Sequence, residues 1–180
     1  VCGQSEATDI LQAYAAQRTA RCIGLVGSCA TGKTSAALAF MNDCGATEGY
    51  PGISYKNGSD FTGSDAKGEA KRTYDWLSCC PLFAECRDNQ HVHGLIIEEC
   101  SKMAHDAVEF FKSALEVCLP PRAIVIVTSN DVSRFQDDDI GRAFLDRFEW
   151  TRMDDTEEFR EAALRRARRI WQHVLTKPHG

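Results

Sequence analysis

Short apolar runs alternate with segments of helical pattern along most of the chain. Four runs of this kind occur, at Cys22–Val26, Ile53–Lys56, Val92–Ile97 and Ala123–Val127. Apolar runs of this length, bounded by turn residues, are typical of buried parallel strands. A fifth strand is expected at Arg147–Trp150. Strands that alternate with helices predict a parallel five-stranded sheet covered on both faces, an α/β fold of three layers.

Helices are expected between and around these strands, and Gly45 is the expected end of the second helix. The predicted helices are 4–18, 35–44, 66–78, 101–118, 140–146 and 156–175. The segment 57–65 reads as a loop, and Asp154 or Asp155 is expected to cap the last helix. That helix carries an apolar stripe that includes Phe159 and Ile170 and an arginine-rich face. Such a face is usually solvated, with a DNA or partner surface as the alternative.

Composition describes an ordinary globular chain. The 180 residues are enough for one domain, or for one domain with a small appendage, and hydrophobic residues make up 43% against 26% charged. The formal net charge of −5 argues against nucleic-acid binding by the whole surface, although it allows a local basic patch. Because no run of about eighteen apolar residues occurs, no membrane span is expected.

Nine cysteines, an odd number, are spread over expected strands, helices and loops. Buried positions such as Cys22 and Cys100 favour free thiols and an intracellular location, where thiols stay reduced. The alternative is a zinc site in one cysteine- and histidine-rich stretch. Its residues are Cys79, Cys80, Cys86, His91 and His93, and their spacing contains no C-x₂-C pair.

The strongest chemical signal lies directly after the first predicted strand. The eight residues Gly27, Ser28, Cys29, Ala30, Thr31, Gly32, Lys33 and Thr34 fit G-x-x-x-x-G-K-[ST], and Ser35 then opens a helix. A loop of this type points backbone N–H groups at phosphate oxygens, and the helix dipole favours the anion. Lys33 is expected at the β- and γ-phosphates, and the Thr34 hydroxyl at Mg²⁺. The pattern predicts that the chain binds ATP with Mg²⁺; a glycine-rich structural turn is the alternative.

Two further strand ends carry polar residues. The third strand ends in Glu98 and Glu99, where the first acid is expected to help hold Mg²⁺ and the second to orient or deprotonate the attacking water. The start of an exposed helix is the alternative for this acidic pair. Asn130 follows the fourth strand, at the sheet edge where ligands bind in α/β folds, and is expected to face the γ-phosphate or the water.

With these motifs in place, the chain resembles the AAA+ ATPases, and within them the clamp-loader subunits that place sliding clamps on DNA. The resemblance rests on the phosphate loop, the turn Asn57–Asp60, the acidic strand end Leu95–Glu99, Asn130 and the segment Gly141–Phe148. It implies an AAA+ core over residues 1–152 and the first helix of a truncated lid domain at 153–180. It also implies an ATPase of DNA replication or repair, with other AAA+ subunits in a ring or arc, primed or double-stranded DNA and a sliding clamp as partners.

The resemblance further implies roles for single residues. Val1 and Cys2 match the short box that lies near the adenine, and Arg147 matches the arginine finger that reaches the next subunit's nucleotide. Arg142 is the fallback for that role, and an ion pair with Asp137–Asp139 is the structural alternative for Arg147. The basic residues that match positions facing the central duplex are Lys67, Lys71, Arg72 and Lys102, with a solvated helix face as the alternative.

Two positions depart from the clamp-loader pattern. Glu98 stands where the family has Asp, and Asp146-Arg147-Phe148 is closer to the Asp-Arg-Phe of branch-migration helicases than to the Ser-Arg-Cys of clamp loaders. One alternative function is a viral or plasmid replication helicase, which also carries a phosphate loop and a strand ending in an asparagine sensor, or a branch-migration-type motor. The former pushes DNA with a basic hairpin between the acidic strand and the sensor strand, for which 99–123 leaves no room. A non-hydrolysing, ATP-dependent interaction subunit is the other alternative.

Overall fold

The computed structural model describes residues 3–17, 21–46, 52–79, 92–117, 119–120 and 122–176. Five parallel strands form one sheet in the order β2-β3-β4-β1-β5. The strands are β1 (Arg21–Val26), β2 (Ile53–Asn57), β3 (His93–Glu98), β4 (Ala123–Ser129) and β5 (Glu149–Arg152). The six helices of the described part are α1 (Ser5–Gln17), α2 (Lys33–Asp43), α3 (Ala66–Cys79), α4 (His105–Val117), α5 (Asp139–Leu145) and α6 (Glu157–Thr176). The expected three-layer α/β fold is thereby confirmed.

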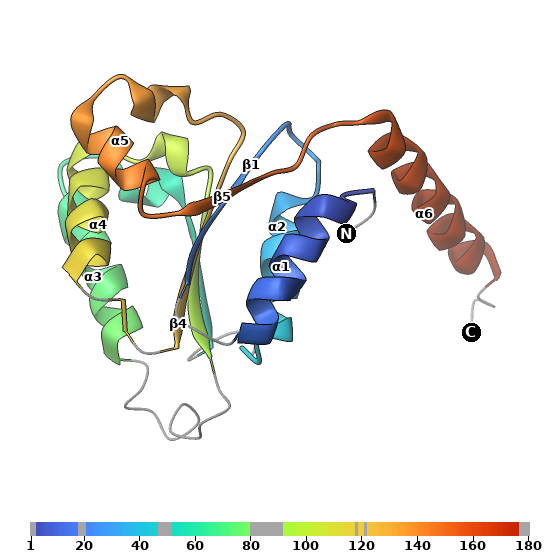
Figure 1. Ribbon diagram of the computed structural model, residues 1–180, viewed down its shortest axis with the longest axis horizontal. Helices are drawn as coiled ribbons and strands as arrows, with labels where there is room; N and C mark the ends of the chain where they lie inside the picture. The colour runs from blue at the N-terminus through green and yellow to red at the C-terminus, as the bar shows by residue number, and fades with distance from the viewer. Residues whose placement is uncertain are drawn as a thin grey trace.

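Helices cover both faces of the sheet, because every central strand is apolar on both sides. On one face α1 and α2 pack against residues such as Ile23, Ile96 and Ile126. On the other face α3, α4 and α5 pack against Leu95 and Val125. Figure 1 shows these two layers on opposite sides of the sheet.

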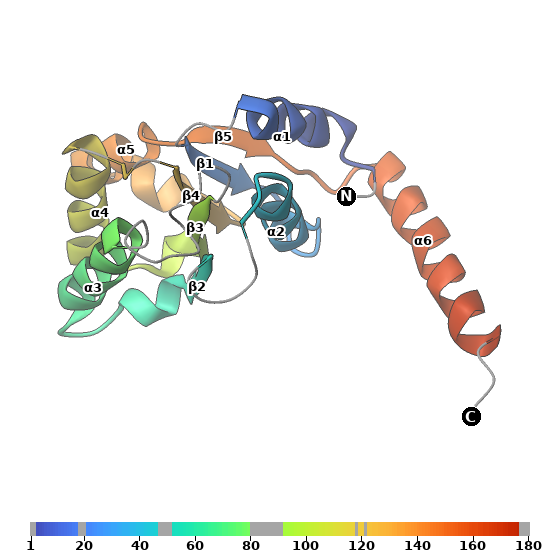
Figure 2. The ribbon, with the colours of Figure 1, turned by 90° about the horizontal axis from the view of Figure 1, so that it is seen from below.

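The last helix, α6, lies apart from these layers, and Figures 1 and 2 both show it extending away from the sheet. It begins beside the N-terminus, where a Cβ at Gly3 would lie 2.4 Å from the Phe159 Cα. Its arginine-rich face is exposed, as expected, and two of the arginines pair with acids nearby, Arg160 with Asp155 and Arg165 with Glu161. On the apolar side Phe159 is half-buried, but Ile170 is 56% exposed.

Several element boundaries differ from the sequence expectations. Residues Gly58–Phe61, expected as loop, form a 3₁₀ helix, because the Asn57 side chain accepts from the Ser59 N–H and Asp60 accepts from the Asn57 N–H in a capping box. The expected helix 101–118 is divided into a 3₁₀ turn at Cys100–Lys102 and α4, because Met103 is extended.

Two further boundary differences lie after α5. Strand β5 starts two residues later than expected, because Arg147 still belongs to the turn that closes α5. The side chain that caps α6 is that of Thr156, which accepts from the Phe159 N–H, rather than that of Asp154 or Asp155.

The zinc hypothesis lies largely outside the described residues. Of its five residues only His93 has a described side chain, which is buried with Nε2 3.0 Å from the Leu77 carbonyl oxygen. Within the described ranges no group of three or more His, Cys, Asp or Glu side chains could hold a metal ion. The four cysteines with described side chains, Cys22, Cys29, Cys44 and Cys100, are free thiols.

Candidate functional site

The phosphate loop runs from the end of β1 to the start of α2. Its backbone requires unusual angles, with φ of +154° at Gly27 and +89° at Gly32. At Gly27 a Cβ would also lie 1.9 Å from the Met153 carbonyl oxygen, so a larger residue cannot fit there. The loop therefore packs tightly against the segment that follows β5, and it leaves the N-terminal amides of α2 facing the carboxyl edge of the sheet.

Lys33 is folded back into the hollow of this loop. Its Nζ donates to the carbonyl oxygens of Gly27 at 2.8 Å and Ser28 at 2.7 Å, and to Asn130 Oδ1 at 3.0 Å. Burial lowers the pKa of Lys33, while the nearby thiol of Cys29 and the carboxylates of Glu98 and Glu99 act in the opposite direction. All three acceptors are neutral, so phosphate oxygens can replace them as stronger, charge-assisted partners.

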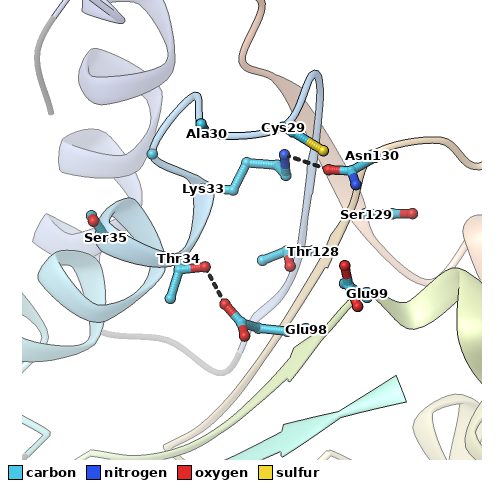
Figure 3. A pocket seen from close by; sticks show the side chains of 11 residues that line it. Cys29, Ala30, Lys33, Thr34, Ser35, Glu98, Glu99, Thr128, Ser129 and Asn130 are labelled. Atoms are coloured by element: carbon cyan, nitrogen blue, oxygen red, sulfur yellow. Dashed lines mark hydrogen bonds between the residues drawn. The ribbon is translucent and has the colours of Figure 1, made fainter. Parts of the chain in front are cut away.

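Thr34, Glu98 and Tyr55 meet beside the loop. The Thr34 hydroxyl donates to Glu98 Oε1, an interaction drawn in Figure 3. Partial burial and the neighbouring Glu98 carboxylate raise the pKa of Tyr55 to about 12. The phenol therefore stays protonated at neutral pH, and toward a carboxylate it can only donate.

Glu99 is the N-terminal boundary of the 3₁₀ turn and adopts left-handed backbone angles, φ +50° and ψ +48°. Its carboxylate pairs with Lys102 Nζ at 2.5 Å, and this contact lowers the pKa of Glu99, with a smaller contribution from the Asn57 side chain. The Glu99 carboxylate is therefore ionised at neutral pH. A Cβ at Gly58 would lie 2.2 Å from the Glu99 carbonyl oxygen, so the turn after β2 packs directly against the backbone of this residue.

These residues line one cavity of about 400 Å³ at the carboxyl ends of β1, β3 and β4. The loop supplies its wall from Cys29, Ala30 and Gly32 to Ser35, and the opposite wall comes from Glu98, Glu99 and Thr128–Asn130. Figure 3 shows Lys33, Glu98, Glu99 and Asn130 converging on this space. Cation, hydroxyl, carboxylates and amide from three strand ends thus share one site, as the sequence motifs predicted.

The donors present fit Mg²⁺. Thr34 and Glu98 offer a hydroxyl and a carboxylate oxygen in contact with each other, and Mg²⁺ in nucleotide sites is held by one or two such oxygens together with phosphates and water. The sulfur and amine groups that line the cavity are poor alternative ligands for Mg²⁺. The sulfur is that of the Cys29 thiol in the loop, and the Lys33 nitrogen is an ammonium without a free lone pair.

A second hollow adjoins the first on the α6 side. It encloses about 460 Å³ between the loop residues Thr31, Gly32 and Ser35, Ala39 of α2, and the α6 side chains of Phe159, Ala163, Arg166, Ala167 and Ile170. Its walls are mostly apolar, in contrast to the cavity around Lys33. It is large enough for a flat, partly apolar ligand group next to the phosphate loop.

Among the described residues, the predicted arginine finger and the basic residues proposed for DNA lie outside the cavity. Val1 and Cys2 fall outside the described residues. Arg147 Nη2 pairs with Glu116 Oε2 at 2.8 Å, and the partner of the Asp137–Asp139 segment is instead Arg142, which pairs with Asp139. The structural alternative for Arg147 therefore named the wrong acid.

The basic residues proposed for DNA are all exposed, but they differ in their pairing. Arg72 pairs with Asp65 at 2.7 Å and Glu69 at 2.9 Å, and Lys102 pairs with Glu99. Lys67 and Lys71, one turn apart on α3, extend into solvent.

Two residues at the site received no role from the sequence. Tyr55 reads there as an ordinary strand residue, and Asn57 as part of a turn. The available signal was register: Tyr55 and Asn57 share one face of β2, and Asn57 pairs with Glu98 on β3. Strand pairing of this kind cannot be read from a single sequence.

Comparisons with known proteins bear on the fold. No protein-family profile matches the sequence, and no curated protein matches it. Among solved structures, one similar chain is a DNA polymerase III gamma subunit-related protein from Thermotoga maritima, with a TM-score of 0.60 and 13% sequence identity. The match covers 86% of this chain and 48% of that one, so this chain spans about half the length of its structural relative. The likeness establishes the fold: a three-layer P-loop α/β fold with a parallel five-stranded sheet, similar to that of this DNA polymerase III gamma subunit-related protein.

Proposed function

We propose that this chain is the MgATP-binding core of an AAA+ ATPase of the clamp-loader type, acting in DNA replication or repair. One observation carries the proposal: Lys33, the Thr34–Glu98 pair, Glu99 and Asn130 converge on a single cavity at the carboxyl edge of the sheet. Each group matches a part that phosphoryl transfer to water requires.

Each residue has a distinct task in this proposal. The amides of the phosphate loop and Lys33 hold the phosphates, and Thr34 and Glu98 hold Mg²⁺, which supplies neutralising charge when bound. Glu99, ionised and lining the same cavity as Asn130, orients the attacking water and accepts its proton. The apolar hollow between α2 and α6 accommodates the base and ribose, with α6 as the start of a lid.

The helicase alternative is less well supported. Described residues between β3 and β4 form one 3₁₀ turn and α4, without a β-hairpin that could push DNA through a ring.

Within the described residues, no helix combines the length and apolar character needed to cross a bilayer. The assembly we propose is an intracellular ring or arc of AAA+ subunits with primed or double-stranded DNA and a sliding clamp as partners.

Lys33→Ala is the direct test of nucleotide binding. We expect MgATP affinity, measured by calorimetry, to fall by well over tenfold, because the variant loses the one cation at the centre of the loop. Folding is expected to persist, because the three partners of Lys33 are neutral and reach water when the side chain is removed.

Lys112→Ala is the matched control, since it removes a lysine from α4 on the opposite face of the sheet. It should bind MgATP as the natural chain does. If Lys33→Ala kept full affinity, the cavity would not be a nucleotide site.

DNA binding is tested by the salt dependence of affinity. Combining Lys67→Ala with Lys71→Ala is expected to weaken binding to primed duplex equally across sequences. It should also flatten the slope of log affinity against log salt by about 0.9 for each phosphate that the variant no longer neutralises. Arg72→Ala is the paired-residue control with a smaller expected effect, because Asp65 and Glu69 already neutralise Arg72. An unchanged slope in the double variant would make α3 a solvated face only.

A further inference from the structure

Tyr55 stands on the strand that pairs with β3, whose last residue, Glu98, lines the cavity. It lies on β2, the edge strand beside β3, and its side chain is 45% exposed although the strand neighbour on the same face, Ile53, is only 8% exposed. The ring therefore contributes less to the core than an aromatic residue on a central strand. Packing in the core therefore accounts for only part of the role of this side chain.

Strand pairing places the Tyr55 side chain near the residues proposed to hold the metal ion. Tyr55 stands opposite Ile96 and Asn57 opposite Glu98, so Tyr55 and Glu98 lie on the same face of adjacent strands. This is the face that α2 covers, and α2 brings Thr34 to the same point. The Glu98 carboxylate and the Thr34 hydroxyl are both close enough to the Tyr55 hydroxyl to shift the pKa of the phenol.

A glutamate at this position needs such a partner. Its carboxylate has one more rotatable bond than that of an aspartate, and each extra side-chain rotation fixed at a site has an entropic cost. Thr34 holds one oxygen of Glu98, but the same hydroxyl is also a candidate metal ligand. A second donor to the carboxylate, carried by a rigid phenol ring, would fix the orientation of Glu98 independently of Thr34.

We infer that Tyr55 is a positioning residue for the metal site: its hydroxyl donates to Glu98 and holds the carboxylate where a divalent cation bound with the nucleotide can use it. The inference rests on the proposed function, since the cation arrives with the phosphates. The inference applies to this chain because Glu98 stands where the clamp-loader pattern has an aspartate. It predicts that the effects of changing Tyr55 and Glu98 on metal affinity are not additive.

Tyr55→Phe tests the inference, because it removes only the hydroxyl and keeps the ring. The measured quantity is the affinity of Mn²⁺, an oxygen-ligand substitute for Mg²⁺ that is visible by electron paramagnetic resonance, for the protein–ADP complex. We expect this affinity to fall by roughly tenfold, the lower end of the usual loss when a residue that orients a metal ligand is removed. ADP affinity in the presence of EDTA should stay unchanged, which a general loss of structure would not allow.

Two further variants make the test specific. Tyr74→Phe is the control, since its hydroxyl donates to the Ala114 carbonyl oxygen on the other face of the sheet; it should leave Mn²⁺ affinity unchanged. In the Glu98→Asp background, where the shorter side chain withdraws the carboxylate from the phenol, Tyr55→Phe should change Mn²⁺ affinity by less than about twofold.

The outcomes separate this inference from the proposed function. If the natural chain binds ADP and Mn²⁺ but Tyr55→Phe binds Mn²⁺ equally well, or loses the same factor in the Glu98→Asp background, Tyr55 does not position Glu98 and its exposed ring serves another contact. If the natural chain binds no nucleotide at all, the proposed function and this inference both fail.

Discussion

Glu99→Gln is expected to reduce ATP hydrolysis by roughly 10²-fold or more, while MgATP affinity stays within about twofold of the natural value. The amide keeps the shape of the side chain but cannot accept a proton from water. In the structure Lys102 lowers the pKa of Glu99, so the carboxylate is ionised and can orient the water, while the same ion pair makes it a weaker base. Steady-state turnover at saturating ATP and calorimetric binding measure the two quantities separately.

Glu69→Gln provides the matched control. Glu69 is also an ion-paired glutamate, held by Lys56 and Arg72, but it lies on α3 outside the cavity. Its replacement should leave turnover unchanged. If instead Glu99→Gln abolished metal binding and Glu98→Gln did not, the two acids would have exchanged roles. A natural chain that binds MgATP but never hydrolyses it would favour the non-hydrolysing interaction subunit.

The site was largely predictable because its parts are local in sequence. The phosphate loop needs only the spacing of Gly27, Gly32 and Lys33 between a strand and a helix. Glu98, Glu99 and Asn130 each follow an apolar run, and in a parallel sheet the ends of such runs meet at one edge. The convergence of these side chains thus follows from the fold class, without knowledge of strand order.

Other features depend on contacts between distant segments. The interaction of Tyr55 with Glu98 and that of Asn57 with Glu99 require the register of β2 against β3, and the partner of Arg147 requires the packing of α4 beside α5. Register and helix packing are set by the whole core. The late start of β5 has a local origin instead: Arg147 belongs to the turn that closes α5, and Trp150 Nε1 donates to the Leu145 carbonyl oxygen.

Arg147→Ala is expected to have the largest effect on turnover. Within one chain, Lys33 is the only arginine or lysine that lines the described cavity, so the charge that develops on the γ-phosphate has no guanidinium beside it. An arginine supplied by a neighbouring subunit in other nucleotide hydrolases contributes about 10³- to 10⁵-fold in rate. We expect a loss of at least about 10³-fold in hydrolysis, with MgATP affinity retained, because the residue acts on the next subunit's nucleotide.

The ion pair with Glu116 supplies the control for this prediction. Arg147 is mostly buried, with a side chain 27% exposed, and its truncation also removes packing. Glu116→Gln breaks the ion pair but keeps the guanidinium. If Arg147 is the finger, Glu116→Gln should hydrolyse ATP normally; if Arg147 is only a structural partner of Glu116, both variants should lose stability and activity together.

Mixing variants decides whether the arginine acts between subunits. Arg147→Ala and Glu99→Gln are each expected to be inactive alone, but their mixture should recover part of the turnover, because an interface formed by one chain of each kind can combine an intact Glu99 with an intact Arg147. Co-assembly is checked by light scattering. Specific activity that does not change on dilution to monomer, or a co-assembled mixture without recovery, would exclude a finger acting between subunits and leave Arg147 as the partner that joins the α5–β5 turn to α4 through Glu116.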